Sequence, residues 1–389
     1  MVKTKVMVKM VRGPIWPNLV PMPAAVEALA DRPSLLPRRL IATLRALGIG
    51  AVGAVATGGA ALAWGQLERR WPTVRRYQVA ALRPDLASQG SAMSEPQISQ
   101  GMQHAASDEV RQEAGVSSSA QCEWAKVRPV TFLHISDLHL FPGQEFLVDF
   151  LNRVARTEHF DAVISTGDNF GSSDGLDLVR AAYEPFLGYP GAFVLGSNDY
   201  YAPARKPWAS YVVDRFAVEP PSRVGLPWWE MVQMFVDAGW VDLTNQAATM
   251  TVSFPDGFKQ PVSLLGVDDP HIERDRMPAV GQDWSDATHL RVALTHAPYK
   301  RVLDSFTQVG ADLVLAGHTH GGQIALPGVG ALLTNSDLPR RYARGLHTWH
   351  TSAGKTPFEV CAGLGTSPFA RVRIAARPEV ALVQLVPTV

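Results

Sequence analysis

The feature that constrains this chain most is a pair of histidines placed between glycines directly after an apolar run. The run Asp312–Ala316 has the sequence DLVLA, which is typical of a short buried strand. It is followed over residues 317–323 by GHTHGGQ, which contains His318 and His320. Two imidazoles two positions apart at the end of a strand can face two neighbouring metal ions. The sequence therefore predicts an α/β domain with metal-binding side chains at one edge of a sheet.

Length and composition exclude several classes of protein. The chain has 389 residues, enough for one large α/β domain with additional segments. Its formal net charge is +0, so no global field attracts nucleic acid, and we expect no nucleic-acid partner. Two cysteines are too few for a disulfide framework. Neither a Gly-rich P-loop nor the GxGxxG pattern of dinucleotide-binding proteins occurs.

The N-terminal part has the features of a targeting or anchoring region. Residues 1–37 have no clear hydrophobic periodicity and are expected to be disordered. The segment 38–65 contains a charge-free run from 46 to 64, which as a helix would nearly cross a hydrocarbon core of ~30 Å. Three interpretations stay open: a transmembrane anchor, a cleavable export signal, and a buried soluble helix. The pair Arg38-Arg39 ahead of this run also resembles a twin-arginine export signal.

Residues 66–127 are expected to form a flexible linker. From Pro84 to Ala125 the chain is rich in Ser, Gln, Ala and Glu and has few large apolar residues, so burial cannot offset the entropy of ordering. The linker would join the N-terminal segment to the region 128–389, which carries the remaining motifs. We therefore expect a single-pass or signal-anchored protein of the cell membrane, with its catalytic domain outside the cytoplasm.

Polar side chains follow a series of apolar runs in the region 128–389. The runs 130–136, 162–166, 192–195, 291–295 and 312–316 are predicted strands, and helical patterns cover 145–160, 176–187, 228–238 and 299–309. The strands end at Asp137 and His139, Asp168, Asn198 and Asp199, His296, and His318 and His320. Ligands of open α/β sheets lie beyond the carboxyl ends of strands, so we expect these side chains to meet. Such residue types suit Mn, Fe or Zn, and the lack of candidate thiolate ligands argues against a structural zinc site.

Two further observations leave alternatives open. A sixth predicted strand, 262–267, ends at Asp268, Asp269 and His271, which either line the pocket or serve the fold. His134 lies in the middle of the strand 130–136 and is interpreted as a packed core residue.

Five of these motifs together resemble the blocks of the calcineurin-like metallophosphoesterases. The matching residues are Asp137-x-His139, Gly167-Asp168, Gly196-x-Asn198-Asp199, His296 and Gly317-His318-x-His320. The resemblance covers about residues 128–389, and the neighbouring residues are similar to the membrane-associated bacterial branch. It implies a four-layer αββα sandwich of two mixed β-sheets, with the metals at one edge.

The resemblance also implies a role for each residue. Asp137, His139 and His320 would hold one divalent metal ion. Asn198, His296 and His318 would hold the second, and Asp168 would bridge the two. Two such ions activate a water molecule and neutralise charge on the transferred phosphoryl group. The implied activity is hydrolysis of phosphate mono- or diesters, with a lipid headgroup or an envelope phosphodiester as the expected substrate of a membrane-tethered enzyme.

The residue after Asn198 departs from the family pattern. The family usually has a histidine after the block-three asparagine, where it steadies the phosphate and protonates the leaving group. This chain has Asp199, which could act as the catalytic acid only if burial or another cause raised its pKa. Otherwise Asp199 orients a water molecule, or the role passes to another residue such as His271. An alternative hypothesis is a catalytically impaired metal-binding or scaffold protein.

Overall fold

The computed structural model describes residues 58–82, 126–203, 224–326 and 328–388. The part of this chain from Ala60 onward forms one compact unit. The predicted extension 1–37 and most of the predicted membrane segment 38–65 lie outside the described residues. Among the helices that are described, none combines the length and the apolar character that crossing a membrane requires.

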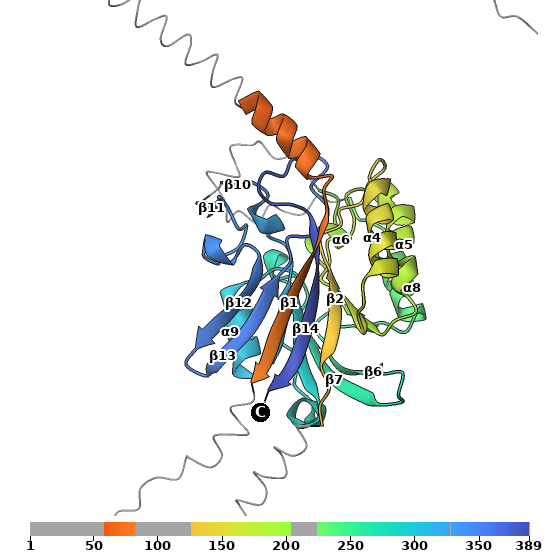
Figure 1. Ribbon diagram of the computed structural model, residues 1–389, viewed down its shortest axis with the longest axis vertical. Helices are drawn as coiled ribbons and strands as arrows, with labels where there is room; N and C mark the ends of the chain where they lie inside the picture. The colour runs from red at the N-terminus through yellow and green to blue at the C-terminus, as the bar shows by residue number, and fades with distance from the viewer. Residues whose placement is uncertain (1–57, 83–125, 204–223, 327, 389) are drawn as a thin grey trace, which may run out of the picture. The chain divides into compact units, whose positions relative to one another are not determined.

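The first of two large sheets is mixed, with the strand order β1-β14-β2-β3-β4-β5, and Figure 1 shows β1, β14 and β2 side by side. Its strands are β1 (Thr73–Leu82), β14 (Glu379–Thr388), β2 (Val130–Ile135), β3 (Ala162–Ser165), β4 (Gly191–Phe193) and β5 (Val241–Asp242). β14 and β2 are antiparallel, and all other neighbours are parallel. The carboxyl ends of β2, β3 and β4 therefore lie at the same edge.

The second sheet is also mixed, with the order β12-β13-β9-β8-β7-β6. Its strands are β12 (Gly345–Thr351), β13 (Gly354–Val360), β9 (Leu313–Ala316), β8 (Leu290–Thr295), β7 (Lys259–Gly266) and β6 (Ala247–Ser253). The strands β7, β8, β9 and β13 are parallel, and β6 and β12 are antiparallel to their neighbours. A small ribbon joins β10 (Ala325–Leu326) and β11 (Gly330–Ala331). The prediction of an α/β fold with two mixed sheets is confirmed.

The helices follow the predicted apolar patterns closely. After residue 125, the α-helices among the described residues are α4 (Glu145–Thr157), α5 (Leu176–Tyr183), α6 (Ser197–Tyr200), α8 (Trp228–Asp237) and α9 (Lys300–Gln308). The 3₁₀ turns are η2 (Ser173–Gly175), η3 (Glu184–Phe186), η4 (Pro270–Ile272), η5 (Gln282–Ser285), η6 (His320–Gly322) and η7 (Arg340–Tyr342). In α4, apolar residues spaced three and four apart all face the core, as the helical period requires.

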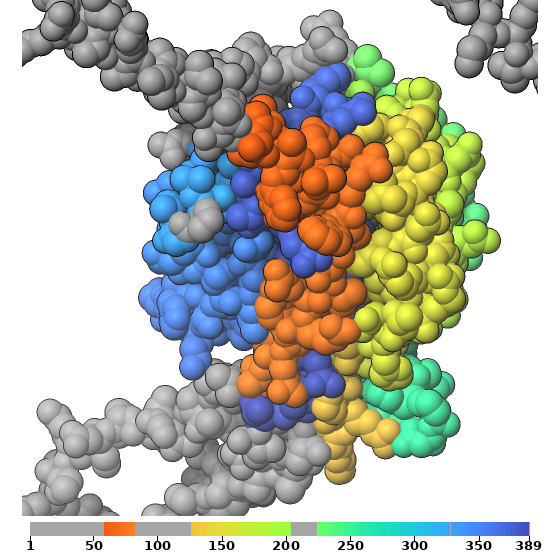
Figure 2. Space-filling view, turned by 45° about the horizontal axis from the view of Figure 1, so that its top comes forward, coloured from red at the N-terminus to blue at the C-terminus, as the bar shows by residue number. Residues whose placement is uncertain are grey.

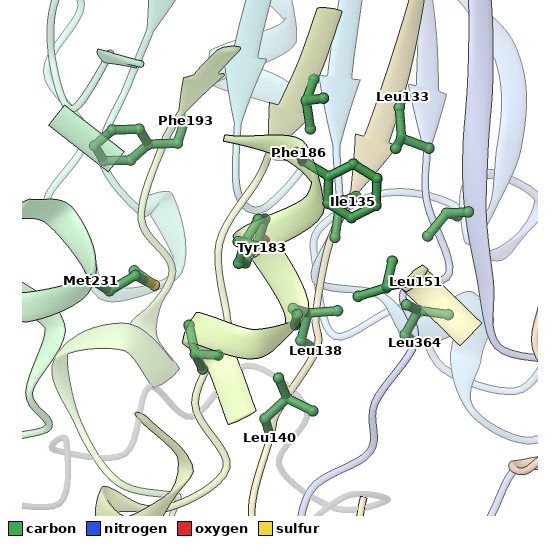
Figure 3. Packing of buried hydrophobic residues seen from close by; sticks show 14 of the residues in the cluster. Leu133, Ile135, Leu138, Leu140, Leu151, Tyr183, Phe186, Phe193, Met231 and Leu364 are labelled. Carbon is green, nitrogen blue, oxygen red and sulfur yellow. The ribbon is translucent and has the colours of Figure 1, made fainter. Parts of the chain in front are cut away.

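Three apolar clusters separate the layers of the fold. One cluster joins α4, α5 and α8 to the first sheet and includes Leu133, Tyr183 and Phe193 (Figure 3). A second lies between the two sheets and includes Phe132, and a third joins α9 to the second sheet. Because side chains alternate along a strand, Phe132 and Leu133 of β2 face opposite sides of the first sheet.

The prediction of a flexible linker over residues 66–127 is wrong for β1, Thr73–Leu82. All ten residues of β1 pair with β14 in parallel, from Thr73 opposite Glu379 to Leu82 opposite Thr388. Figure 2 shows residues 58–82 in orange on the surface, against the dark blue C-terminal residues. The strand escaped prediction because it is an edge strand with exposed charges at Arg75 and Arg76. The domain therefore begins before residue 128.

Candidate metal centre

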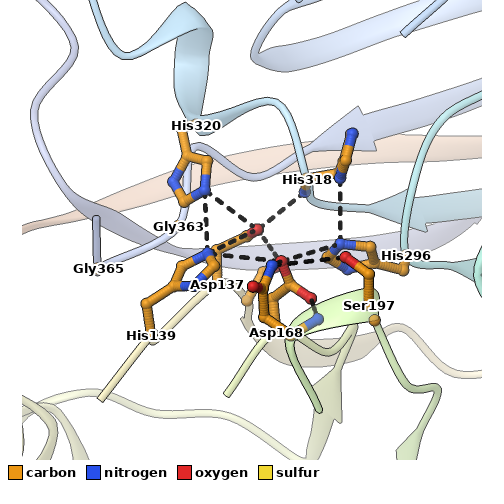
Figure 4. A network of polar contacts seen from close by, with 12 residues as sticks. Asp137, His139, Asp168, Ser197, His296, His318, His320, Gly363 and Gly365 are labelled. Carbon is orange, nitrogen blue, oxygen red and sulfur yellow. Dashed lines mark hydrogen bonds and ion pairs between the residues drawn. The ribbon is translucent and has the colours of Figure 1, made fainter. Parts of the chain in front are cut away.

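The carboxyl ends of parallel strands from both sheets meet at one edge, and their loops are joined by backbone hydrogen bonds. The amide of Asp137 donates to Gly167 O at 2.9 Å, and that of His139 donates to Asp168 O at 3.0 Å. Between the loops that follow β8 and β9, Gly317 N donates to His296 O at 2.8 Å. Figure 4 shows the side chains of six predicted ligands pointing toward one another: Asp137, His139, Asp168, His296, His318 and His320. The predicted convergence of these six is confirmed.

Backbone strain is concentrated in these loops. Ten described non-glycine residues have positive φ, and half of them are predicted ligands. These five are Asp137 (φ 50°), His139 (φ 42°), Asp168 (φ 60°), His318 (φ 70°) and His320 (φ 51°). A left-handed backbone costs a non-glycine residue of order 1–3 kcal/mol and persists only where the surroundings enforce it. The fold therefore bears this cost at the positions that aim side chains into the site.

One glycine of the GHTHGGQ segment is required by close packing. A Cβ atom at Gly317 would collide with Ser136 Oγ and with Asp137 Oδ2. The loop after β9 can therefore approach the loop after β2 only if residue 317 has no side chain. This approach lets His318 N donate a hydrogen bond to Asp137 Oδ2 at 2.9 Å.

The first ligand group consists of Asp137, His139 and His320, which lie close enough to hold one cation. The Nε2 atoms of the two histidines are 3.1 Å apart, and Asp137 Oδ1 is 3.9 Å and 3.6 Å from them. Asp137 Oδ1 is buried and has no hydrogen-bond partner among the described residues. A buried carboxylate oxygen without a partner is costly, and a divalent cation between these three atoms would satisfy it. The residues thus fit a metal ion.

The second ligand group consists of Asp168, His296 and His318. His296 Nε2 lies 3.4 Å from Asp168 Oδ2 and 3.2 Å from His318 Nδ1. The remote nitrogen of each histidine contacts a backbone carbonyl: His296 Nδ1 donates to Thr166 O at 2.7 Å, and His318 Nε2 donates to Asn335 O at 2.9 Å. These bonds orient both rings, so that His296 Nε2 and His318 Nδ1 face the site.

Asp168 belongs to the second group but also lies close to the first. Its Oδ2 atom is 3.5 Å from His139 Nε2 in the first group and 3.4 Å from His296 Nε2 in the second. A single carboxylate is therefore within reach of both candidate cation positions, which is the arrangement that a bridging ligand needs.

Asn198 contacts Asp168 through both its side-chain amide and its backbone. Its Nδ2 atom donates to Asp168 Oδ2 at 2.7 Å, and its backbone N–H donates to Asp168 Oδ1 at 2.7 Å. Its ligand role stays a prediction. Ser197, which sequence analysis did not single out, lies with Asp168 and His296 in the same cluster (Figure 4), and its hydroxyl is 3.4 Å from Asn198 Nδ2.

Asp199 is fully buried and is surrounded by N–H donors. Its Oδ2 accepts from the backbone N–H groups of Asp168 and Gly196, both at 2.8 Å. Its Oδ1 accepts from Asn169 N at 2.8 Å and from Asn169 Nδ2 at 3.1 Å. Burial, followed by the nearby Asp168, raises its pKa to about 6. Although the pKa is raised as a proton donor would need, both oxygens are occupied within the loops, which is the geometry of a positioning residue.

The electrostatics keep most of the histidines neutral. Burial lowers the pKa of His318 and His320 well below the usual value, and their imidazole neighbours add to this effect. Burial alone would lower the pKa of His296, but Asp168 outweighs it and holds that pKa well above the usual value. Correspondingly, His296 outweighs burial at Asp168 and holds its pKa well below the usual value. Neutral imidazole is the form that binds metals, so His318 and His320 are ready to do so.

The segment after β7 borders the second ligand group. The ring centroid of His271 is 4.5 Å from that of His318, and its Nδ1 lies 3.0 Å from Tyr299 Oη. Asp269 is fully buried, accepts a hydrogen bond from His271 N, and has its pKa raised to about 7, chiefly by burial. Asp268 instead forms an ion pair with Arg274 at 2.7 Å. Of the three candidates, His271 is half-buried beside the group and Asp268 serves the fold.

Sequence analysis also missed residues that support the ligands. The hydroxyl of Ser136 donates to Asp137 Oδ2 at 2.6 Å, and that of Thr166 donates to Ser136 Oγ at 2.7 Å. Arg373, fully buried, has its Nη2 atom 3.1 Å from His320 Nδ1. Ser136 directly precedes Asp137, and Thr166 lies two positions before Asp168. This proximity in sequence could have indicated that the two hydroxyls support the acidic ligands. No local pattern marks Arg373, because it lies 53 residues from His320.

The described geometry agrees with comparisons to known proteins. The family model of the calcineurin-like phosphoesterases matches residues 130–322. An uncharacterized metallophosphoesterase of Bacillus subtilis, YkoQ, is 24% identical over 269 residues, which cover 66% of this chain and 84% of that protein.

Solved structures give weaker likenesses. A protein of Thermus thermophilus has a TM-score of 0.33 and 14% identity, covering 60% of this chain and 90% of that one. The phosphopantetheinyl hydrolase of Mycobacterium tuberculosis has a TM-score of 0.33 and 13% identity, covering 66% of this chain and 96% of that one.

The family match and the two candidate metal groups place the protein in the class of metal-dependent hydrolases of phosphate esters. The chain belongs to the calcineurin-like phosphoesterase family.

Proposed function

We propose that this protein hydrolyses phosphate mono- or diesters with two divalent metal ions, of Mn, Fe or Zn, held by the two ligand groups. The observation that carries this proposal is the position of Asp168 Oδ2, 3.5 Å from His139 Nε2 and 3.4 Å from His296 Nε2. When bound, such ions supply an activated water molecule and neutralise charge on the phosphoryl group. Neutral imidazoles and few carboxylates supply ligands without making the site strongly anionic.

His271 is the proposed donor of the proton to the leaving group. It is half-buried, and its ring lies 4.5 Å from that of His318, so a substrate at the second ligand group would lie within its reach. Asp199 is less suited to this role, because four N–H groups occupy its oxygens. At neutral pH a histidine is in general also the more effective general acid, because the ordinary pKa of an imidazole lies close to that pH.

The proposal is tested by assaying the chelator-treated full chain with bis-p-nitrophenyl phosphate and p-nitrophenyl phosphate in Mn²⁺. A fragment that begins at residue 128 is unsuitable, because it lacks β1 and exposes the edge of β14. His271→Gln should lower kcat by about 10²-fold or more while metal content stays unchanged. His159→Ala is the control, because the side chain of His159 is 93% exposed. No turnover by the folded, metal-loaded protein would contradict the proposal.

The alternative of a catalytically impaired scaffold protein is distinguished by the same assay. Restoring a family-like histidine at position 199 is not a suitable test, because it would remove the acceptor of three backbone N–H groups. Metal binding with no turnover against either ester would favour the scaffold. Turnover that depends on His271 would exclude it.

We also propose that the protein acts at a membrane, on a lipid headgroup or an envelope phosphodiester, with the domain outside the cytoplasm. The charge-free run 46–64 supports this proposal. The exposed side chains of Trp64, Leu67 and Trp71 also support it, and Arg69 and Arg70 lie between Leu67 and Trp71 in the sequence. Exposed tryptophans beside basic residues favour a membrane interface. Fractionation of cells that express the full chain tests the location, and protease added outside tests the orientation. Recovery in the soluble cytoplasmic fraction would contradict both.

A further inference from the structure

A line of buried side chains leads from the space between the two sheets to the first ligand group. Glu359 Oε2 lies 2.6 Å from His134 Nδ1, and His134 Nε2 lies 2.9 Å from Thr166 Oγ1. Thr166 then contacts Ser136 at 2.7 Å, and Ser136 contacts Asp137 Oδ2 at 2.6 Å. All five side chains are fully buried. Four short contacts therefore connect Glu359 with a candidate metal ligand.

The direction of these hydrogen bonds follows from the ligand end. A carboxylate only accepts, so Ser136 Oγ–H must donate to Asp137 Oδ2. The single hydroxyl hydrogen of Ser136 is then used, so Thr166 Oγ–H donates to Ser136 Oγ. Thr166 Oγ1 in turn accepts from His134, whose Nε2 must therefore carry a hydrogen. The hydrogen on Nε2 of this core histidine thus follows from the contacts of a ligand three residues later, Asp137.

The other end of the line holds His134 in place. In β2, His134 follows Phe132 at a spacing of two and faces the second sheet, where Glu359 of β13 meets it. Both side chains have no exposed surface. A buried ionisable pair contributes little net stability compared with apolar residues of similar volume. His134 lies in the core, as the sequence analysis interpreted it, but packing alone does not account for its pairing with Glu359.

We propose that His134, Thr166 and Ser136 are positioning residues that orient Asp137 toward the metal. Ser136 Oγ and His318 N occupy Asp137 Oδ2, which leaves the unpartnered Oδ1 facing His139 and His320. Rotation of the carboxylate would break both bonds to Oδ2. The hydroxyl chain thereby fixes the geometry of the first ligand group, while the second group has supports of its own. This inference rests on the metal binding of the proposed function.

The test compares Thr166→Val with Thr166→Ser in the full chain. Valine keeps the shape but interrupts the hydroxyl chain, whereas serine retains the hydroxyl. Each chelator-treated protein is titrated with Mn²⁺ by calorimetry, and its thermal unfolding is measured without metal. We expect Thr166→Val to bind one of two Mn²⁺ equivalents about 10–100-fold more weakly and the other normally, and Thr166→Ser to bind as the wild type does.

Ser136→Ala provides a second variant in case Thr166→Val does not fold. It removes the donor to Asp137 and should weaken the same equivalent at least as much. If the wild type binds two Mn²⁺ equivalents and both Ser136→Ala and Thr166→Val bind them with unchanged affinity, the inference is overturned. Equal weakening of both equivalents would overturn it as well, since that is the effect of a general structural role. A wild type that binds no Mn²⁺ would instead overturn the proposed function itself.

Discussion

The two ligand groups share Asp168 as a neighbour but differ in how their histidines are supported. In the second group, the remote nitrogens of His296 and His318 donate to backbone carbonyls at 2.7 Å and 2.9 Å. In the first group, His139 Nδ1 is buried with no hydrogen-bond partner among the described residues, and His320 Nδ1 faces the guanidinium of Arg373. The second group is therefore organised before a metal binds, and the first depends more on its carboxylate.

The comparison teaches that one site can contain a rigid half and an adjustable half. Remote hydrogen bonds fix the orientation and basicity of a ligating imidazole, and their loss typically costs 10–100-fold in metal affinity. We therefore expect the second ligand group to bind its cation more tightly than the first.

The largest effect is expected from Asp168→Asn, because Asp168 serves both groups. Loss of several kcal/mol of transition-state stabilisation should lower kcat/KM by about 10³-fold. Metal content, measured by mass spectrometry after dialysis, should fall from two equivalents to one or none. Asp177→Asn, at a side chain that is 97% exposed, is the control. Retention of two equivalents and full activity would show that Asp168 is not shared.

Single-ligand variants distinguish the two groups. His296→Ala should abolish the tighter of two Mn²⁺ equivalents in a calorimetric titration, whereas His139→Ala should abolish the weaker one. The expected difference between the two equivalents in the wild type is about 10-fold or more, from the unequal support of the remote nitrogens. If His139→Ala removed the tighter equivalent, the proposed order of the two groups would be reversed.

Asp199→Asn should affect stability before it affects chemistry. An amide has one acceptor oxygen, so at least one backbone N–H that now contacts Asp199 would lose its acceptor, at a cost of about 1–3 kcal/mol for each. Thermal unfolding of the metal-free protein should shift to lower temperature. An unchanged Tm together with a complete loss of turnover would instead support the predicted role of Asp199 as the catalytic acid.

The last prediction concerns the pH dependence of stability and Asp269, whose pKa burial raises from 3.8 to about 7. Between these values the folded state binds a proton that the unfolded state has released, so stability falls as pH rises. The slope is at most about 1.4 kcal/mol per pH unit, and it ends above about pH 7. Asp269→Asn should reduce this slope, measured as Tm in EDTA from pH 4 to 8. Identical slopes in both proteins would contradict the assignment.

Much of the fold was predictable because its central strands are short apolar runs with polar ends. The predicted ligands lie together for the same reason, since carboxyl ends of parallel strands share an edge, and Asn198 joins them through its contacts with Asp168. β1 was not predictable, because only Val79 and Ala81 of its side chains are described as buried, and its partner β14 lies some 300 residues later.

The support of the ligands was less predictable than the ligands themselves. The contacts of Asp199 with Asp168 and Asn169 span about 30 residues, and those of His134 with Glu359 span 225. The contact of His134 depends on how the two sheets face each other, and those of Asp199 depend on how the loops after β3 and β4 meet, which no local pattern encodes. No local pattern predicted that four N–H groups would surround Asp199, and its role as a catalytic acid stays a prediction.

The central claim is that two cations bind on either side of Asp168. Anomalous diffraction from crystals grown with Mn²⁺ tests it most directly. The account predicts two peaks about 3.5–4 Å apart, one beside Asp137, His139 and His320 and the other beside His296 and His318. A single peak, or peaks remote from Asp168, would contradict it.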